Sequence, residues 1–450
     1  MLIPLASKTW RALKPLELFG ALSGDPTLFW LEFGGPAQGW SYLGAGPSSD
    51  GLKHSALQVC LDQAGVKAAS ATRETDPPFS GGWIIQLDYP GMHCALKKPV
   101  EIVQSGINAR HYPVMLAYSH VQAAWYACVS PAQSGSRRQG VEVLNSMVSR
   151  CEAQIHNNHT ILHHFLTNEN KIYFRKSIYI ESIIHALKYI SEGDIYQINL
   201  AQAFNAKWEG LPEQLHAAMR AQGSADYGAY LGAAFSDGDR SLCCGSPELF
   251  LEVRGGEVVT RPIKGTRALG AGMAETLDAA RELETNAKER AELNMIVDLE
   301  RNDLGRVCEY GSVRVESAGA VQVLPGLLHR TAAVRGRLRA GVTLGELLAA
   351  TFPGGSITGA PKVRAMELIA ELEGVSRGAY CGAIGWVGFD GDLQLNIAIR
   401  TAQYSAAKKA ACYFAGSGIV ADSEPLREYE ETVLKARGFL KAVNGVVVES

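Results

Sequence analysis

The chain has 450 residues and a formal net charge of −3, so it lacks the basic excess that would indicate a nucleic acid or an anionic membrane as partner. Hydrophobic residues make up 47% and charged residues 20%, which allows a large buried core in two or three average domains. No run of 18 apolar residues occurs, and the first 20 residues lack the apolar stretch of a secretory signal, so we expect neither a transmembrane helix nor export.

The number and spacing of the cysteines indicate the redox state of the cellular compartment. Nine are scattered along the chain, no two form a C-x-x-C pair, and their odd number does not suit a disulfide framework. We therefore expect reduced thiols in a cytoplasmic protein.

The first part of the chain has the pattern of short strands. Residues 30–33, 40–44 and 82–87 are rich in aromatic or β-branched residues, and clusters of Gly, Pro, Ser and Asp separate them. A polar, Ser- and Gly-rich stretch follows. We predict an N-terminal region over residues 1–135 that packs on the rest of the chain, and a connector over 136–175.

A helix and a strand follow the connector. Apolar residues recur at helical spacing over residues 178–190, and a Glu-Gly-Asp sequence ends the pattern. Residues 195–200 have the composition of a strand in which Gln197 and Asn199 share one face. Two amides pointing the same way are suggestive of a polar binding surface.

A β-hairpin is predicted over residues 248–261, where two apolar runs flank Gly255-Gly256. With a three-residue loop, Glu248 would lie opposite Lys264 in the extended hairpin, with Cβ atoms roughly 5 Å apart. A two-residue loop would place the two side chains on opposite faces. From the hairpin alone, the lysine is either a surface partner of the carboxylate or a nucleophile.

Two later helices each carry a pair of glutamates. Glu289 and Glu292 lie three residues apart within the helical stretch 277–306, and Glu428 and Glu431 repeat that spacing near the end of the chain. Like charges so placed repel unless a cation or a basic partner lies nearby. The two pairs could hold one hard cation, for which Mg²⁺ suits oxygen ligands; two solvated helix faces are the alternative.

A glycine-rich loop at residues 352–362 precedes another helix. Its backbone N–H groups and the helix N-terminus favour an anion, and because the Walker sequence is absent, a carboxylate suits it as well as a phosphate. Strands are expected at 393–401, carrying Arg400, and at 411–415, ending in a loop at Gly416-Ser417-Gly418.

Four segments together resemble the chorismate-utilising enzymes, a family that includes anthranilate, isochorismate, salicylate and aminodeoxychorismate synthases. They are Pro262-Ile263-Lys264-Gly265-Thr266, residues 295–305 (MIVDLERNDLG), the glycine-rich loop and residues 416–423 (GSGIVADS). They occur in the family's order. The resemblance implies an α+β fold of the anthranilate synthase component I type, with large antiparallel β-sheets flanked by helices around a buried chorismate site, and a catalytic domain over 176–447.

Two positions narrow the reaction that the resemblance implies. The lysine with which isochorismate and salicylate synthases activate water looks to be replaced by Gln197, which cannot serve as that base. Anthranilate synthases typically have Pro-Ile-Ala-Gly-Thr in the hairpin motif, whereas aminodeoxychorismate synthases have a lysine, as here at Lys264. We therefore expect amination of chorismate at C4, on the route to p-aminobenzoate and folate, with anthranilate formation as the alternative.

The resemblance also assigns roles to single residues. Lys264 would be the covalent nucleophile, Glu248 the general acid and His329 a histidine near the C4 hydroxyl. The positions that match Mg²⁺ ligands, directly or through water, are Glu292, Glu431, Glu289 and Glu428. The positions that match substrate-binding residues are Gln197, Asn199, Thr266, Ser356, Tyr380, Arg400, Gly416 and Lys435.

The resemblance stops short in two places. Relatives regulated by tryptophan carry a Leu-Leu-Glu-Ser motif that Leu22-Ser23-Gly24-Asp25 does not reproduce, so we do not expect inhibition by tryptophan. No segment resembles a glutamine amidotransferase. The ammonia is therefore expected from a separate glutaminase subunit or from solution.

Overall fold

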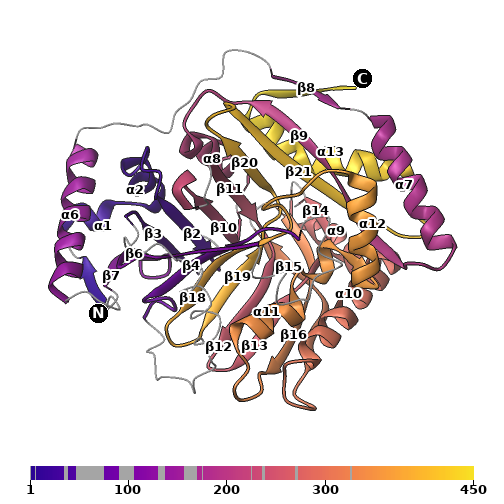
Figure 1. Ribbon diagram of the computed structural model, residues 1–450, viewed down its shortest axis with the longest axis horizontal. Helices are drawn as coiled ribbons and strands as arrows, with labels where there is room; N and C mark the ends of the chain where they lie inside the picture. Colours follow the sequence, from indigo (N-terminus) through magenta and orange to yellow (C-terminus); the bar gives the residue numbers. More distant parts are fainter. Residues whose placement is uncertain are drawn as a thin grey trace.

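The computed structural model describes residues 2–5, 7–34, 39–46, 76–90, 106–129, 137–156, 170–174, 176–223, 225–235, 239–268, 272–324 and 327–449. Two large antiparallel β-sheets lie face to face, and helices cover their outer surfaces (Figure 1). The predicted α+β fold with large antiparallel sheets is confirmed.

The larger sheet has 11 strands and combines segments from both ends of the chain. In spatial order they are β1 (Leu2–Leu5), β7 (Ala124–Val129), β6 (Val114–Ser119), β3 (Trp40–Gly44), β2 (Phe29–Phe33), β10 (Tyr227–Leu231), β11 (Arg240–Ser246), β20 (Thr401–Ser405), β21 (Ala410–Ile419), β9 (Gln197–Lys207) and β17 (Gly359–Ala360). Ala229 of β10 pairs with Leu31 of β2. The N-terminal strands therefore continue the sheet that carries the amide strand β9.

The smaller sheet has nine strands. They are β14 (Ile263–Ala268), β16 (Leu327–Arg337), β13 (Glu257–Arg261), β12 (Leu249–Arg254), β19 (Leu393–Ile397), β18 (Ala383–Gly388), β4 (Gly82–Leu87) and β5 (Ile107–His111), with β15 (Arg314–Leu324) paired to β16. A separate parallel pair is formed by β22 (Gly445–Glu449) and β8 (Asn170–Phe174).

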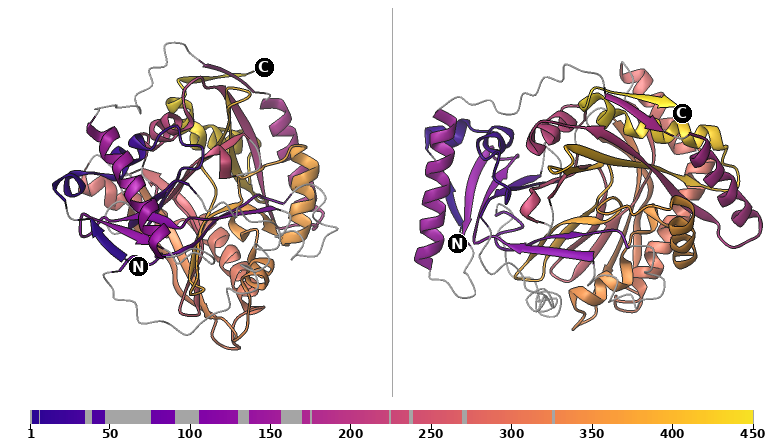
Figure 2. Two further views of the ribbon diagram at one scale, coloured as in Figure 1. Left: turned by 60° about the vertical axis from the view of Figure 1, so that its left-hand side comes forward. Right: turned by 45° about the horizontal axis from the view of Figure 1, so that its top comes forward.

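The helices lie mainly on the outside of the two sheets, as both views in Figure 2 show. They are α1 (Lys8–Ala12), α2 (Pro15–Ala21), α6 (Arg137–His156), α7 (Lys176–Ser191), α8 (Pro212–Arg220), α9 (Met273–Thr285), α10 (Ala287–Gly305), α11 (Leu344–Thr351), α12 (Lys362–Glu373) and α13 (Pro425–Ala442). α13 packs on β21 and α12 on β9, whereas α10 packs on β14 and β16. Within the described ranges, none of the helices combines the length and apolar character needed to cross a membrane.

The apolar core lies between the two sheets. Leu31 of β2 and Leu231 of β10, in the larger sheet, belong to the same buried cluster as Ile84 of β4 and Ile384 of β18, in the smaller sheet. Each of these side chains contributes roughly 1.5–3 kcal/mol when it is fully removed from water. The burial of these inner faces therefore holds the two sheets against each other.

Most predicted elements are present, including the strands at 40–44 and 82–87 and the helix α7. Two expectations near the C-terminus were wrong. The strand predicted at 393–401 ends at Ile397, and Arg400 lies beyond it in a left-handed backbone conformation with φ of 51°. Gly416 and Gly418 lie inside β21 rather than in a loop, since β21 pairs with β9 as far as Ile419.

Candidate active site

Lys264 is the second residue of β14, and it pairs with Arg330 on β16. The next residue, Gly265, has φ of 72°, a conformation that favours glycine, and a bulge interrupts the pairing there. A Cβ atom at Gly265 would lie 2.5 Å from Glu289 Oε2. The glycine thus permits helix α10 to approach the strand that carries the lysine.

The three-residue hairpin loop considered above does not occur. Arg254 pairs with Glu257 across a two-residue loop, in which Gly255 and Gly256 have φ of 53° and 86°. Left-handed conformations at both central residues are typical of a type I′ turn, which matches the twist of the flanking strands.

Lys264 nevertheless lies close to Glu248. A bulge after Leu249 shifts the register of β12, and β14 is a separate strand that pairs with β16 instead of continuing the hairpin. The Ile263 N–H donates to Glu248 Oε1 over 3.4 Å, which brings the carboxyl group beside the lysine strand. The two side chains are therefore neighbours through a bulge and a strand change, not through direct cross-strand pairing.

Glu248 is buried, with 4% of its surface exposed. Burial raises its pKa to about 6, while the hydroxyl of Ser356 and the ammonium of Lys264 oppose the rise. Ser356 Oγ is itself buried and reaches no partner in hydrogen-bond geometry among the described residues, so it acts on the carboxyl as a nearby dipole. A carboxyl group with this pKa can donate a proton near neutral pH.

Lys264 is shifted in the opposite direction. Burial lowers its pKa, the carboxylates of Glu292 and Glu248 oppose this, and the ammonium of Lys435 acts with burial. A lowered pKa raises the fraction of neutral amine, which is the nucleophilic form. A proton donor and a nucleophile with pKa values moved toward each other are typical of a catalytic pair.

The amide strand faces the same place. A Cβ atom at Gly418 would lie 3.2 Å from Gln197 Nε2 and 3.4 Å from Lys264 Nζ, so the two side chains converge at this glycine. Within the described residues, both polar atoms of Gln197 and Oδ1 of Asn199 are buried without a hydrogen-bond partner. Buried amides in this state are rare in folded proteins, and they are available to a polar ligand.

Lys435, on α13, closes another side of the site. Its Nζ donates to the carbonyl of Gly416 over 2.9 Å and lies 2.7 Å from Glu431 Oε1. Burial alone would raise the pKa of Glu431, but the ammonium of Lys435 outweighs it and the pKa is lowered. Because 45% and 47% of the two side chains are exposed, water screens this ion pair.

His329, the third residue of β16, lies close enough to Arg400 for the guanidinium to act on its imidazole. Burial and the guanidinium of Arg400 lower the pKa of His329 to about 4, so its imidazole is neutral at physiological pH. Arg400 keeps its left-handed conformation between β19 and β20, where the Gly245 N–H donates to its carbonyl over 3.0 Å. A non-glycine residue in this region costs roughly 1–3 kcal/mol, which the surrounding structure must supply.

Tyr380 and Thr266 complete the set of predicted substrate-binding positions. Tyr380 is 4% exposed and stacks on Phe414 with ring centroids 5.4 Å apart, and burial raises its pKa well above the usual range. Its hydroxyl therefore remains a proton donor. The backbone of Thr266 pairs with His329, but the Thr266 side chain lies outside the described part, so its role remains a prediction.

The four predicted Mg²⁺ ligands come from two helices. Glu289 and Glu292 occupy the start of α10, which Asn286 caps by accepting from the Glu289 N–H over 3.0 Å. Burial raises the pKa of Glu292, Lys264 lowers it, and the carboxylates of Glu431 and Glu428 raise it further. The glutamates of α10 and α13 thus act on one another electrostatically.

These carboxylates do not surround a single point. Across the described ranges, no group of three or more His, Cys, Asp or Glu side chains is arranged to hold a metal ion. Glu289 pairs with Arg267 over 3.0 Å, and Glu428 accepts from Ser423 over 2.7 Å. Oε2 of Glu289 is buried and has no hydrogen-bond partner among the residues described, as expected of an oxygen available to a ligand. The Mg²⁺ site remains a prediction.

Two buried acids on α10 were not singled out from the sequence. Glu300 and Asp303 contact the glycine-rich loop and repeat the spacing of Glu289 and Glu292 eleven residues later. Eleven residues make about three helical turns, so all four carboxylates share one face of the helix. That repeat is the signal that could have identified them.

Arg377 was also overlooked. It is 2% exposed and forms a buried ion pair with Glu373, with Nη2 and Oε1 2.7 Å apart. The same guanidinium donates to the carbonyls of Ile357, in the glycine-rich loop, over 3.1 Å and of Asn199, in the amide strand, over 2.7 Å. Arg377 therefore fixes two walls of the site relative to each other.

Comparison with known proteins gives a consistent family. The chorismate binding enzyme family matches residues 35–441. The chain is 42% identical over 270 residues, 60% of its length, to aminodeoxychorismate synthase component 1 of Bacillus subtilis (strain 168), covering 56% of that protein. It is 41% identical over 271 residues, again 60% of its length, to anthranilate synthase component 1 of Aquifex aeolicus (strain VF5), covering 53% of that protein. The matched stretch thus spans just over half the length of these two relatives.

Solved structures share the fold over nearly the whole chain. Anthranilate synthase component I from Streptococcus pneumoniae TIGR4 has a TM-score of 0.70 at 28% identity, covering 92% of this chain and 90% of that one. MenF, the menaquinone-specific isochorismate synthase from Escherichia coli, has a TM-score of 0.72 at 18% identity, covering 98% and 94%. The predicted anthranilate synthase component I type of fold is confirmed.

Proposed function

Because the chain belongs to the chorismate binding enzyme family, we propose that it is the chorismate-aminating component I of an aminodeoxychorismate synthase. The observation that carries the proposal is the placement of Lys264, a lysine with a lowered pKa, beside the proton donor Glu248 and the partnerless amide of Gln197. The product would be 4-amino-4-deoxychorismate, a precursor of p-aminobenzoate and folate.

In the first step, neutral Lys264 Nζ forms a bond to C2 of the chorismate ring while the C4–O bond breaks. Glu248 gives its proton to the departing hydroxyl, which leaves as water. Neutral His329 lies on the strand next to β14, where it can hydrogen-bond that hydroxyl before it leaves. Without proton transfer hydroxide is a poor leaving group, and a positioned acid typically contributes 10²–10⁴-fold.

In the second step, ammonia forms a bond to C4 and the C2–Nζ bond breaks, which returns Lys264 as an amine after proton transfer. The net reaction consumes chorismate and ammonia and releases aminodeoxychorismate and water. Ring and side-chain carboxylates of the substrate would meet Arg400, Lys435 and the hydroxyl of Tyr380, where charge-assisted hydrogen bonds are strongest. Asn199 and Ser356 would contribute neutral polar contacts.

We further propose Mg²⁺ as cofactor. Glu292 and Glu431 would hold the ion, with Glu289 and Glu428 acting through water. The buried, partnerless Oε2 of Glu289 supports this, as does the pKa of Glu292, which is raised chiefly by burial and further by the carboxylates of Glu431 and Glu428. When bound, the ion would neutralise a substrate carboxylate and stabilise developing charge.

The proposal includes a partner and a location. Ammonia would be delivered by a separate glutamine amidotransferase subunit, and the protein would work in the cytoplasm. The cysteines within the described ranges are all free thiols, as a reducing compartment requires.

Anthranilate synthase component I is the second candidate, because relatives with that name are about as similar to the chain as those named aminodeoxychorismate synthase. The two are distinguished by incubating the chain with chorismate, Mg²⁺ and an ammonium salt at mildly alkaline pH and separating the products by chromatography. Aminodeoxychorismate, converted to p-aminobenzoate by an added lyase, is the expected product. Anthranilate would instead assign the second function, and it would show that Lys264 does not redirect amination to C4.

A further inference from the structure

A buried acid outside the reacting groups holds the glycine-rich loop against α10. We propose that Glu300 is a positioning residue, which places the Ser356 hydroxyl against Glu248 by holding the backbone of Gly355. This inference rests on the proposed function for its kinetic test, but the contact itself can be tested without turnover.

The contact is direct. The Gly355 N–H donates to Glu300 Oε1 over 2.9 Å, and Glu300 is 2% exposed. A Cβ atom at Gly355 would lie 2.7 Å from Leu299 Cδ2 and 3.1 Å from Glu300 Oε1. Any side chain at this position would have to displace Leu299 and crowd the carboxyl group, so the glycine favours the close approach of the loop to α10.

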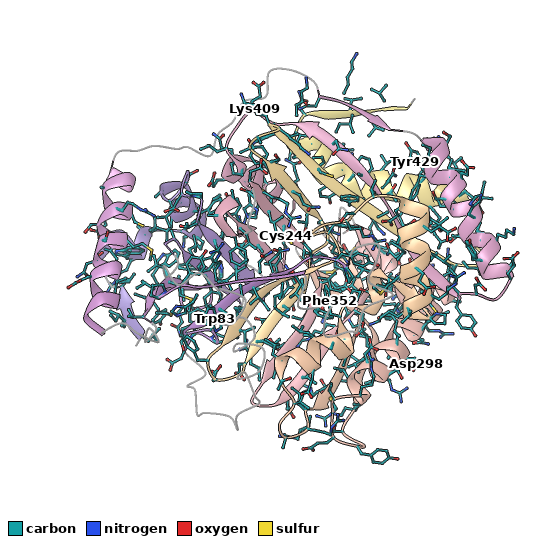
Figure 3. The ribbon with its side chains drawn as sticks, in the orientation of Figure 1. Trp83, Cys244, Asp298, Phe352, Lys409 and Tyr429 are labelled. Atoms are coloured by element: carbon teal, nitrogen blue, oxygen red, sulfur yellow. The ribbon has the colours of Figure 1, made fainter. Side chains whose placement is uncertain are left out.

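Lys362, at the end of the loop, joins the start of the loop to the same helix. Lys362 Nζ lies 2.5 Å from Asp303 Oδ2 and donates to the carbonyls of Thr351 and Pro353 over 3.1 and 2.7 Å. Phe352, at the beginning of the loop, lies in the interior of the molecule, whereas Asp298 on α10 lies at its periphery (Figure 3). With the start of the loop fixed by Asp303, the contact from Glu300 determines the position of its next turn.

That turn contains Ser356, the residue directly after Gly355. Ser356 is 5% exposed; its hydroxyl lowers the pKa of Glu248 and has no hydrogen-bond partner of its own within the described residues. A displacement of the loop would remove this dipole from the proton donor. Displacements of about 1 Å at an active site can cost roughly 10²-fold in rate.

A carboxyl group is an uncommon choice for a purely structural anchor at this depth. Burial raises the pKa of Glu300 to about 7, with the ammonium of Lys362 opposing the rise, and Oε2 has no hydrogen-bond partner in the described part of the chain. Either protonation state leaves Oε1 able to accept from Gly355. Glutamine has the same shape and a carbonyl oxygen, so Glu300→Gln should still accept the hydrogen bond from Gly355.

The test compares Glu300→Leu, which cannot accept the hydrogen bond, with Glu300→Gln, which can. Consumption of chorismate in the presence of ammonia and Mg²⁺ should show kcat reduced roughly 10- to 100-fold in Glu300→Leu, with KM changed less than about threefold. Glu300→Gln should stay within about threefold of the unaltered enzyme. Combining Glu300→Leu with Ser356→Ala should cost little beyond the larger single effect, because both act through the same hydroxyl.

Asp298→Asn is the matched control, since Asp298 lies on the exposed face of the same helix with 71% of its side chain accessible. Glu300→Ala serves the same purpose as the leucine variant should that one fail to fold. Normal kcat in Glu300→Leu and Glu300→Ala, equal damage in Glu300→Gln, or multiplicative effects with Ser356→Ala would each overturn the proposal.

Hydrogen exchange at the Gly355 amide provides the measurement that needs no turnover. We expect exchange to be at least about tenfold faster in Glu300→Leu than in the unaltered protein, and near normal in Glu300→Gln and Asp298→Asn. Unchanged exchange in Glu300→Leu would refute the anchoring contact. If the unaltered chain makes anthranilate or consumes no chorismate, the proposed function fails while this result still decides the role of Glu300.

Discussion

Glu248→Gln should separate stability from catalysis. The carboxyl group is buried beside Lys264, and at alkaline pH the fold must bear the cost of its ionised form. Glutamine has the same shape and no charge. We therefore expect the variant to have a larger free energy of unfolding than the unaltered protein at alkaline pH, while its turnover falls roughly 10²–10⁴-fold because it cannot donate a proton.

The magnitude follows from the pKa of Glu248, which is raised from 4.5 to about 6. A raised folded-state pKa favours the protonated form, so the stability it contributes is present below pH 4.5 and is lost as the pH rises through about 6. Compared with a carboxyl group of unshifted pKa, a rise of about 1.5 units lowers the free energy of unfolding by about 2 kcal/mol at pH 8 and by less than about 1 kcal/mol at pH 5. The gain from the substitution should grow by about 1 kcal/mol over this interval.

Urea unfolding at several pH values between 5 and 8, with EDTA present, measures this gain. Glu430→Gln is a matched control, because it makes the same change at an exposed position of α13, where we expect less than about 0.5 kcal/mol at any pH. A gain of equal size at pH 5 and pH 8, or a loss of stability at pH 8, would refute the reasoning about the buried carboxyl group.

Three further perturbations test other parts of the site. Lys264→Ala should abolish aminodeoxychorismate and allow some anthranilate, because ammonia could then attack C2 directly; undiminished native product on chromatography would remove the lysine from the mechanism. Glu292→Gln or Glu431→Gln should raise the Mg²⁺ concentration needed for half-maximal turnover at least about tenfold, and an unchanged titration would count against the carboxylate site. Arg377→Met should lower the free energy of unfolding by about 3–5 kcal/mol, since it leaves Glu373 buried without its partner. Adding Glu373→Leu should recover part of that loss. A loss below about 1 kcal/mol in urea unfolding would contradict the structural role of Arg377.

Sequence reasoning predicted the fold class and most strands, because period-two patterns and glycine turns act locally. It also identified Glu248 and Lys264 as neighbours, but for a partly wrong reason. The Gly255-Gly256 loop gives a register that would separate them. A bulge in β12 and the pairing of β14 with β16 bring them together, and no local pattern predicts a long-range choice of strand partner.

The same limit applies to Arg400 and Glu300. The left-handed conformation of Arg400 depends on packing between β19, β20 and the Gly245 backbone, which lies 155 residues away in the sequence. The contact of Glu300 with Gly355 spans 55 residues. A helical repeat places Glu300 on a face, but only the tertiary structure shows what that face meets.

The continuity of the two sheets limits how the chain can be shortened. A fragment starting near residue 176 would retain every residue assigned to the chemistry, yet β10 would lose its partner β2 and β18 would lose β4. Both strands would become open edges with unsatisfied backbone groups, which are templates for intermolecular pairing. Such a fragment should aggregate rather than catalyse, so the N-terminal strands serve the reaction by protecting the edges of the sheets on which it takes place.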